Sequence, residues 1–188
     1  MRKIIILAFI ISPSLFCYSQ KASSSGTESV FKKSESIEKN AIGKAFPPFM
    51  IFNNETEWSN QKLLGKTVYI NFWFSSCVPC MAEMPQLNDL YEKFKGDSNF
   101  VFISISFDKL EQINAVKLKH NIRYDIFSVS IIECMKMNSA KSFPASIILD
   151  KNGVVIFYET GGLGINLLTT RHFKRKIYPA IENSLNDR

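Results

Sequence analysis

The sequence has few of the residues that build metal sites or disulfide frameworks. Its 188 residues include four cysteines and two histidines, and only one CxxC motif is present. Neither His120 nor His172 has ligand spacing with that motif, which disfavours a zinc site with four protein ligands. No internal repeat is visible. We therefore expect one domain with no metal and no cofactor.

A hydrophobic run long enough to span a membrane is also missing. Residues 4–11 are apolar and uncharged, but they are too few to cross a bilayer core of about 30 Å, which disfavours a retained anchor. Cys17 and Ser19 place small residues at the −3 and −1 positions, so residues 1–19 are predicted to be a signal peptide. Lipidation of Cys17 is an alternative that the bulk of Phe16 disfavours. The expected location is the periplasm or cell envelope.

Charge is balanced rather than strongly of one sign. Loss of two basic residues with the leader would lower the formal net charge from +6 to +4, which does not indicate nucleic-acid binding. Residues 20–40 are rich in Ser, Lys and Glu and hold too little apolar surface to order themselves, so a flexible tether is predicted. Residues 41–188 suffice for one domain with a sizeable core.

The domain reads as alternating strands and helices. Asn152-Gly153 between two apolar runs predicts a β-hairpin, and Pro179 is a candidate bend in the last helix. The order is β-α-β followed by β-β-α, which favours an α/β fold, a three-layer α/β/α sandwich around a central mixed sheet. The predicted strands are residues 49–52, 67–74, 100–107, 126–129, 145–149 and 154–158, and the helices are a segment after the CxxC motif that Gly96 closes and residues 112–120, 131–139 and 169–185.

The CxxC motif, Cys77-Val78-Pro79-Cys80, lies between an apolar strand and a helix. Free N–H groups and the positive dipole end at a helix N-terminus stabilise a thiolate. Pro79 suits a first helical position, where its missing N–H costs nothing. This arrangement predicts a redox-active pair. Cys134 would then be left over, and we interpret it as a buried small apolar residue rather than a functional thiol.

The chain resembles the thioredoxin superfamily and, within it, the TlpA/ResA-like exported thiol–disulfide oxidoreductases. The most specific match is CxPCxxExP after an NFW strand, with a later proline before a strand. The matching stretches follow the family order at residues 42–49, 64–68, 71–73, 77–85, 143–144 and 149–153. The resemblance implies a thioredoxin-like fold and a protein-disulfide oxidoreductase acting on disulfide-bearing exported proteins. It also implies the reducing direction, as for apocytochrome c, with electrons from a membrane thiol donor.

The resemblance assigns a role to each residue of the motif. Cys77 would be the exposed attacking thiolate and Cys80 the resolving cysteine. Thioredoxins place a buried Asp where this chain has Asn71, so Glu83 is the acid left to move a proton from Cys80; the alternative is a helix-surface carboxylate. Pro144 would be a cis-proline facing the cysteines, beside which a substrate segment pairs as an added strand.

Two departures from the family pattern concern the substrate-binding surface. Ser76 stands where a Trp usually precedes the first cysteine, and Phe143 stands where a small or β-branched residue usually precedes the proline. The first makes the site more polar, and the bulk of the second narrows substrate choice. The expected substrate-binding residues are Trp73, Ser76, Pro79, Phe143 and Pro144, with a core position as the alternative for Trp73.

Two other functions remain as alternatives. A peroxiredoxin-like peroxidase needs Pro and Thr where this chain has Ile70 and Phe74. A non-catalytic binding module of thioredoxin fold would hold a partner without turnover, and its cellular role would survive Cys77→Ser. The basic residues of the last helix are interpreted as a solvated face: Arg171, Lys174, Arg175 and Lys176.

Overall fold

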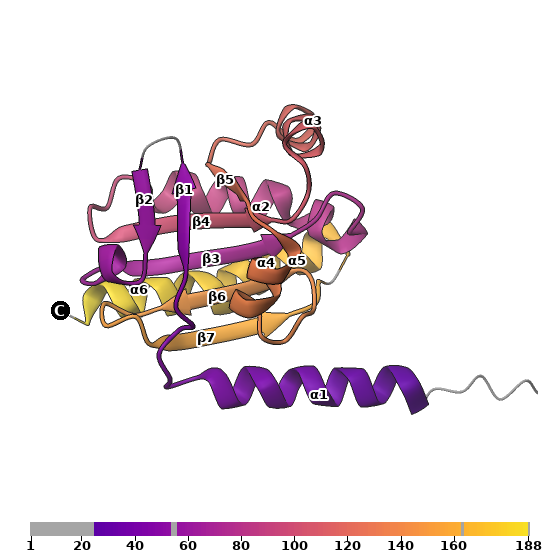
Figure 1. Ribbon diagram of the computed structural model, residues 1–188, viewed down its shortest axis with the longest axis horizontal. Coiled ribbons are helices and arrows are strands. Elements are labelled where there is room, and N and C mark those ends of the chain that lie inside the picture. Colours follow the sequence, from indigo (N-terminus) through magenta and orange to yellow (C-terminus); the bar gives the residue numbers. More distant parts are fainter. Residues whose placement is uncertain (1–24, 54–55, 163, 188) are drawn as a thin grey trace, which may run out of the picture.

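The computed structural model describes residues 25–53, 56–162 and 164–187, so the predicted signal peptide lies outside the described residues. Its central sheet has the strand order β5-β4-β3-β6-β7 (Figure 1). β3, β4 and β5 run parallel, and β6 and β7 continue the sheet antiparallel, so the predicted mixed sheet is confirmed. The strands span Thr67–Trp73 (β3), Phe100–Ser106 (β4), Ile126–Ser128 (β5), Ala145–Leu149 (β6) and Val155–Thr160 (β7).

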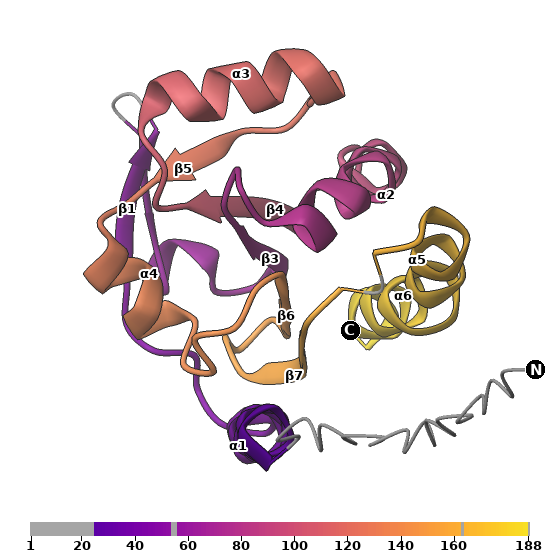
Figure 2. The same cartoon turned by 90° about the vertical axis from the view of Figure 1, so that its right-hand side faces the viewer.

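Helices and a small hairpin cover the two faces of the sheet (Figure 2). One face carries α2 (Val78–Phe94), α5 (Asn166–His172) and α6 (Tyr178–Asn186). The opposite face carries α4 (Ile131–Met137) and the hairpin of β1 (Met50–Asn53) and β2 (Thr56–Ser59), while α3 (Leu110–His120) lies next to β5. A 3-10 turn, Gln61–Leu63, leads toward β3. The three layers are those that the sequence predicts, although β2 was not foreseen.

β3 is buried on both faces, which explains its nearly continuous apolar sequence. Tyr69 and Trp73 belong to the core under α2, whereas Ile70 and Phe72 belong to the core on the hairpin side. The alternation follows from the two-residue period of a strand. The two cores hold β3 in place. Because α2 starts just after the C-terminal end of β3, they also determine the position of the CxxC motif.

The N-terminal helix α1 (Ser25–Ala41) corrects one prediction. It runs along β7 in both views, where a flexible tether was expected for residues 20–40 (Figures 1 and 2). Polar side chains make the contact: Oγ of Ser34 lies 2.8 Å from Oγ1 of Thr160, and the Thr160 hydroxyl donates to Glu38. The prediction considered only apolar surface, and these bonds form with a strand more than a hundred residues away.

The predicted final helix is interrupted. A π-helical turn, Phe173–Ile177, separates α5 from α6, and Pro179 lies in the first turn of α6. Proline supplies no N–H to the preceding turn, so a break in the α-helical hydrogen-bond ladder is expected next to it.

Among the helices that the structure describes, none is long and apolar enough to cross a membrane.

Candidate active site

The two cysteines of the motif form a disulfide at the N-terminus of α2. Their Cα atoms are 5.2 Å apart, and Sγ of Cys77 accepts a hydrogen bond from the backbone N–H of Cys80 at 3.2 Å. Cys77 is the N-cap residue and Pro79 lies in the first turn, as predicted. Cys77 is less exposed than the resemblance implies, at 6%, but it remains more accessible than Cys80 at 1%. Val78 beside it is 76% exposed, so a partner can reach the turn.

Asp108 fixes the loop that leads from β3 into Cys77, and sequence reasoning missed it. Its Oδ2 accepts hydrogen bonds from the backbone N–H of Ser75 at 2.5 Å and from the hydroxyl of Ser106 at 3.1 Å. Asp108 follows the C-terminal end of β4, which is parallel to β3, so the two strand ends meet at one edge. A polar residue just after a buried parallel strand was the available signal.

The peptide bond between Phe143 and Pro144 is cis, as expected from the resemblance. The Phe143 ring packs edge-on against Phe74, with centroids 5.3 Å apart, and against Phe107 at 5.7 Å. Phe74 and Phe107 stack on each other at 5.3 Å. This phenylalanine cluster joins the loop before Cys77 to the proline, and it gives the bulk of Phe143 a packing role in addition to the predicted effect on substrate choice.

Trp73 does not belong to the substrate-binding surface, which corrects that assignment. Its side chain has no exposed area, and its indole N–H donates to Oγ of Ser104 at 2.8 Å. It is the last residue of β3 and points into the core under α2. Ser76 is exposed and Pro79 is half-buried, so both remain candidates for substrate contact.

Glu83 is buried one helical turn after Cys80 rather than lying on the surface of α2. Only 6% of it is exposed, and its carboxylate has no hydrogen-bond partner among the described residues. Burial raises the pKa of Glu83 to about 8, and the charge of Glu159 adds to the shift. Both protonation states are therefore populated near neutral pH, which is the property required of a group that exchanges protons there.

Gly162 is the point at which the motif, the cis-proline and the buried acid meet. A β-carbon built on Gly162 would lie 2.8 Å from Cβ of Pro79, 3.1 Å from Cγ of Pro144 and 3.2 Å from Oε1 of Glu83. The backbone N–H of the neighbouring Gly161 donates to the carbonyl of Pro144 at 2.8 Å. Only a residue without a side chain fits here, and sequence reasoning did not identify it.

A cavity of about 330 Å³ opens beside Glu83, and we call it the Glu83 cavity. Glu159 of β7 lies there 2.9 Å from Nε2 of His172 and forms an ion pair with Nζ of Lys176 at 2.8 Å. Burial would raise the pKa of Glu159, but His172 and Lys176 together outweigh burial and lower it. The cavity is lined by Glu83, Glu159, Thr160, Gly161, Gly162, Thr169, His172 and Lys176.

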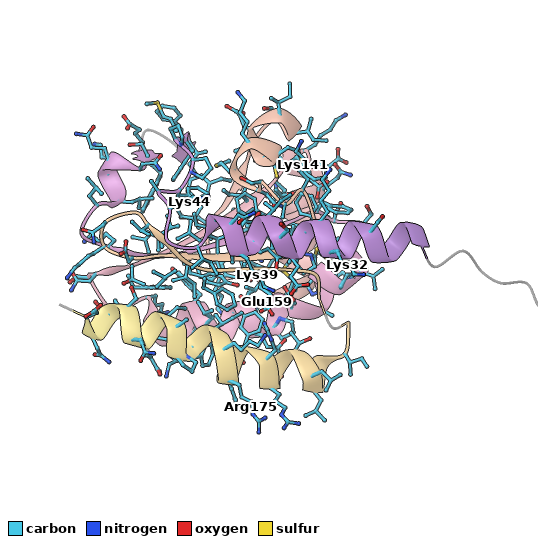
Figure 3. The ribbon with its side chains drawn as sticks, turned by 90° about the horizontal axis from the view of Figure 1, so that it is seen from below. Lys32, Lys39, Lys44, Lys141, Glu159 and Arg175 are labelled. Carbon is cyan, nitrogen blue, oxygen red and sulfur yellow. A yellow bond between two sulfur atoms is a disulfide. The ribbon has the colours of Figure 1, made fainter. Side chains whose placement is uncertain are left out.

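The basic run on the last helices divides into two parts. Arg171, Lys174 and Arg175 are exposed, in line with a solvated face. Figure 3 shows Arg175 pointing away from the protein, whereas Glu159 lies between the C-terminal helices and α1. Lys176 differs from the other three because it reaches Glu159.

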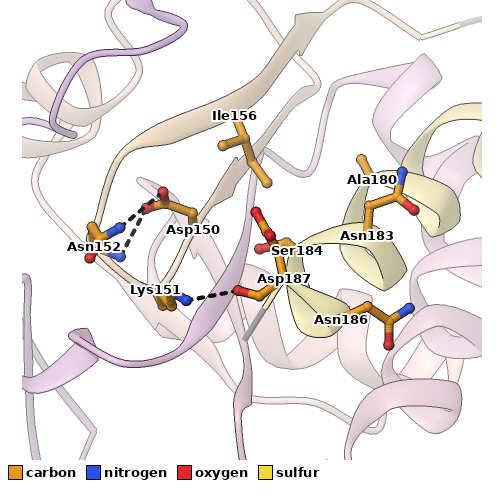
Figure 4. A pocket seen from close by; sticks show the side chains of 9 residues that line it. All are labelled: Asp150, Lys151, Asn152, Ile156, Ala180, Asn183, Ser184, Asn186 and Asp187. Atoms are coloured by element: carbon orange, nitrogen blue, oxygen red, sulfur yellow. Dashed lines mark hydrogen bonds between the residues drawn. The ribbon is translucent and has the colours of Figure 1, made fainter.

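A larger hollow, of about 690 Å³, lies at the other end of the sheet (Figure 4). Its lining includes the turn 150–152 between β6 and β7, Ile156 and the last turns of α6, where Nζ of Lys151 donates to the carbonyl of Asp187 at 2.8 Å. No expected site residue lines it. Within the described ranges, no group of three or more His, Cys, Asp or Glu side chains could hold a metal ion.

Cys134 lies apart from the disulfide, in the core on the hairpin side of the sheet. It has no exposed area, and burial raises the pKa of its thiol to about 12. Both observations fit the interpretation of Cys134 as a buried packing residue.

Comparison with known proteins identifies the family. A profile of the AhpC/TSA family matches residues 42–158. The thiol-disulfide oxidoreductase ResA of Bacillus cereus is 35% identical over 125 residues, which are 63% of this chain and 69% of the relative. The thiol-disulfide oxidoreductase YkuV of Bacillus subtilis is 29% identical over 134 residues, which are 66% of this chain and 90% of the relative.

Solved structures support the same fold. The thioredoxin domain of a thiol-disulfide oxidoreductase from Bacteroides vulgatus superimposes with a TM-score of 0.57 at 22% identity, covering 70% of this chain and 96% of that one. A thiol:disulfide interchange protein of the thioredoxin family from Chlorobium tepidum gives 0.58 at 19% identity, covering 77% and 98%. The chain therefore belongs to the AhpC/TSA family of the thioredoxin superfamily, and within it to the ResA-like protein-disulfide oxidoreductases.

Proposed function

We propose that the protein reduces disulfides of exported proteins in the cell envelope, with Cys77 as nucleophile, Cys80 as resolving thiol and Glu83 as proton acceptor and donor. The observation that carries the proposal is the position of Glu83, buried one turn behind Cys80 and next to Pro144 through Gly162. A maturation role like that for apocytochrome c is one use of this chemistry.

The reaction starts from the dithiol form. The Cys77 thiolate, which has released its proton to water, attacks one sulfur of a target disulfide; a mixed disulfide forms, and the first target sulfur leaves as a thiolate that takes up a proton from water. Cys80 then gives its proton to Glu83 and attacks Sγ of Cys77, the second target sulfur leaves as a thiolate, and Glu83 returns the proton to it. The target gains two electrons and two protons, and the product is the Cys77–Cys80 disulfide that the structure contains.

The helix end supports Cys77 as the attacking sulfur. Its Sγ accepts the N–H of Cys80, and this bond together with the dipole of α2 stabilises a thiolate at that position. Cys80 is less exposed than Cys77, which supports its assignment as the resolving thiol. Their unequal exposure supports the proposed division into an attacking and a resolving cysteine.

The target would approach over the exposed turn. The surface of this turn consists of Ser76, Val78 and Pro79. An extended segment of the target would pair with the backbone beside Pro144 in the manner of an added strand. Regeneration needs a dithiol outside the cytoplasm, for which a membrane thiol carrier is the proposed donor. The predicted signal peptide supports export, and a mature N-terminus at Gln20 would establish it; a lipid-modified Cys17 would instead indicate a lipoprotein.

Direction is tested by the redox potential of the cysteine pair. The protein is equilibrated in glutathione buffers, and the dithiol fraction is counted by alkylation and mass. A potential well below about −200 mV supports a reductant, whereas a value near −120 mV would make the protein an oxidant and the stated direction wrong.

The roles of the cysteines are tested by trapping partners in cells. Cys80→Ser should accumulate mixed disulfides because the resolving step is lost, and Cys77→Ser should accumulate none. A cellular role that survives Cys77→Ser would favour the binding module over the enzyme.

A further inference from the structure

The Glu83 cavity holds two carboxylates whose environments differ. Among the described residues Glu83 has no basic partner, whereas Glu159 has two, with His172 Nε2 and Lys176 Nζ both within 3 Å. Glu83 is buried in α2 and Glu159 is half-buried in β7, and both line the same 330 Å³ space. Two carboxylates that share a cavity seldom ionise together, and the one with partners keeps the charge.

We propose that Glu159, held in place by His172 and Lys176, is a positioning residue whose negative charge acts across the cavity on Glu83, adds to the effect of burial and opposes ionisation of the Glu83 carboxyl. This inference rests on the proposed function insofar as Glu83 serves Cys80. Glu159 touches neither cysteine and acts only through Glu83, across the cavity.

The other groups that face Glu83 cannot replace this effect. Cys80 on the same helix is held in the disulfide and does not titrate. Tyr69 of β3 and Tyr124, which precedes β5, both interact with Glu83, and burial raises the pKa of each phenol far above neutrality. The other titratable groups among the described lining residues of the cavity are Glu159, His172 and Lys176, so the field at Glu83 depends on this cluster.

The opposite charges of Glu159 and Lys176 predict that their removal shifts the titration of Glu83 in opposite directions. Glu159→Gln removes a negative charge and leaves Lys176 facing the cavity, so Glu83 should release its proton about one pH unit lower. Lys176→Gln removes a positive charge while His172 still pairs with Glu159, so Glu83 should titrate at a higher pH. The second shift should be the smaller, because the Lys176 side chain is 55% exposed and its charge is screened by water.

The experiment follows the titration of Glu83 directly. Purified oxidised protein carrying ¹³C-labelled glutamate is titrated by NMR, and the Glu83 side-chain signal is assigned by its absence in Glu83→Gln. In the oxidised state Cys77 and Cys80 carry no titrating thiol, so the midpoint belongs to Glu83. Lys174→Gln is the matched control, since it removes the same charge from the same helical turn on the exposed face.

The expected result is a lower midpoint for Glu159→Gln, a higher one for Lys176→Gln and no change for Lys174→Gln. An unmoved midpoint in Glu159→Gln, or shifts of the same sign in both variants, would overturn the proposal. If Glu159→Gln does not fold, the surface variant Lys176→Gln decides alone, by whether its midpoint rises.

The pH profile of disulfide exchange is recorded on the same variants. Midpoints that move with opposite signs while the exchange profile stays fixed would leave the inference intact and show that Glu83 does not serve Cys80. The two proposals therefore fail separately.

Discussion

Gly162 lies so close to Pro79 that a β-carbon added to Gly162 would come within 2.8 Å of Cβ of Pro79. The two residues are 83 positions apart in the sequence, and their contact joins the end of β7 to the start of α2. The disulfide, the cis-proline and the buried acid therefore share one tightly packed junction.

Gly162→Ala should disturb this junction. A methyl group at Gly162 must displace Pro79, Pro144 or Glu83, which should cost about 1–3 kcal/mol of unfolding free energy and slow disulfide exchange. Urea unfolding and a dithiol–disulfide exchange assay measure the two effects. Gly96→Ala is the matched control, because nothing lies within 4 Å of its β-carbon and its backbone is unstrained. Equal effects of both substitutions would show that the close contact has no importance.

Glu83 should make stability depend on pH. Its pKa is raised to about 8 in the folded protein but is ordinary in the unfolded chain, so the unfolded chain loses the proton first as pH rises. The unfolding free energy should then fall between about pH 5 and pH 8, by at most ~1.4 kcal/mol per pH unit, and level off above. Below pH 4 the acid is protonated in both states and contributes no slope.

Comparison with Glu83→Gln isolates this contribution. The variant should lack the decline, so the difference in unfolding free energy between variant and wild type should grow from pH 5 to pH 8 in urea titrations. A difference that is the same at both pH values would mean that Glu83 is charged in the folded state.

The hydroxyl of Thr160 should anchor α1. Thr160→Val removes its contacts with Ser34 and Glu38, which should weaken the docking of α1 by about 1–2 kcal/mol. Amide hydrogen exchange should then speed up in α1 and stay unchanged in β3. Glu35→Gln breaks only the exposed pair with Lys39 and should have little effect.

Cys134 should be unreactive in the folded protein. Because burial raises the pKa of its thiol to about 12, only about one molecule in ten thousand carries the thiolate at pH 8. After mild reduction, iodoacetamide should label Cys77 and leave Cys134 unmodified until denaturant is added, which peptide mass mapping would show. Labelling of Cys134 in the native protein would contradict its assignment to the core.

The predictable parts of the structure were those written in local patterns. The sheet was predicted from the apolar runs of β3, β4 and β6, because burial on both faces requires a continuous apolar sequence. The turn at Asn152-Gly153 predicted the hairpin of β6 and β7. The positions of Cys77 and Pro79 at the start of α2 followed from the same strand–helix reasoning.

The parts that were missed depend on contacts between distant segments. Gly162 has no sequence signature, since its importance comes from Pro79 and Pro144 across the junction. Glu159 was not singled out from the sequence, because its importance comes from His172 and Lys176, which the fold brings beside it. α1 was missed because its docking uses polar groups. Trp73 was assigned to the substrate-binding surface, but the alternation of side chains along β3 directs it into the core under α2.

The position of α1 affects how much of the sheet's edge is open to other polypeptide chains. An edge strand has unpaired backbone N–H and C=O groups, which can pair with other extended chains and cause aggregation. Here one border is occupied: Gly43 and Val155 are joined by a backbone hydrogen bond of 2.8 Å, and α1 runs along β7 beyond that point. The opposite border, β5, is only three residues long. The sheet thus leaves little of its edges open to unselective pairing, which favours the proposed pairing of a substrate segment with the backbone beside Pro144.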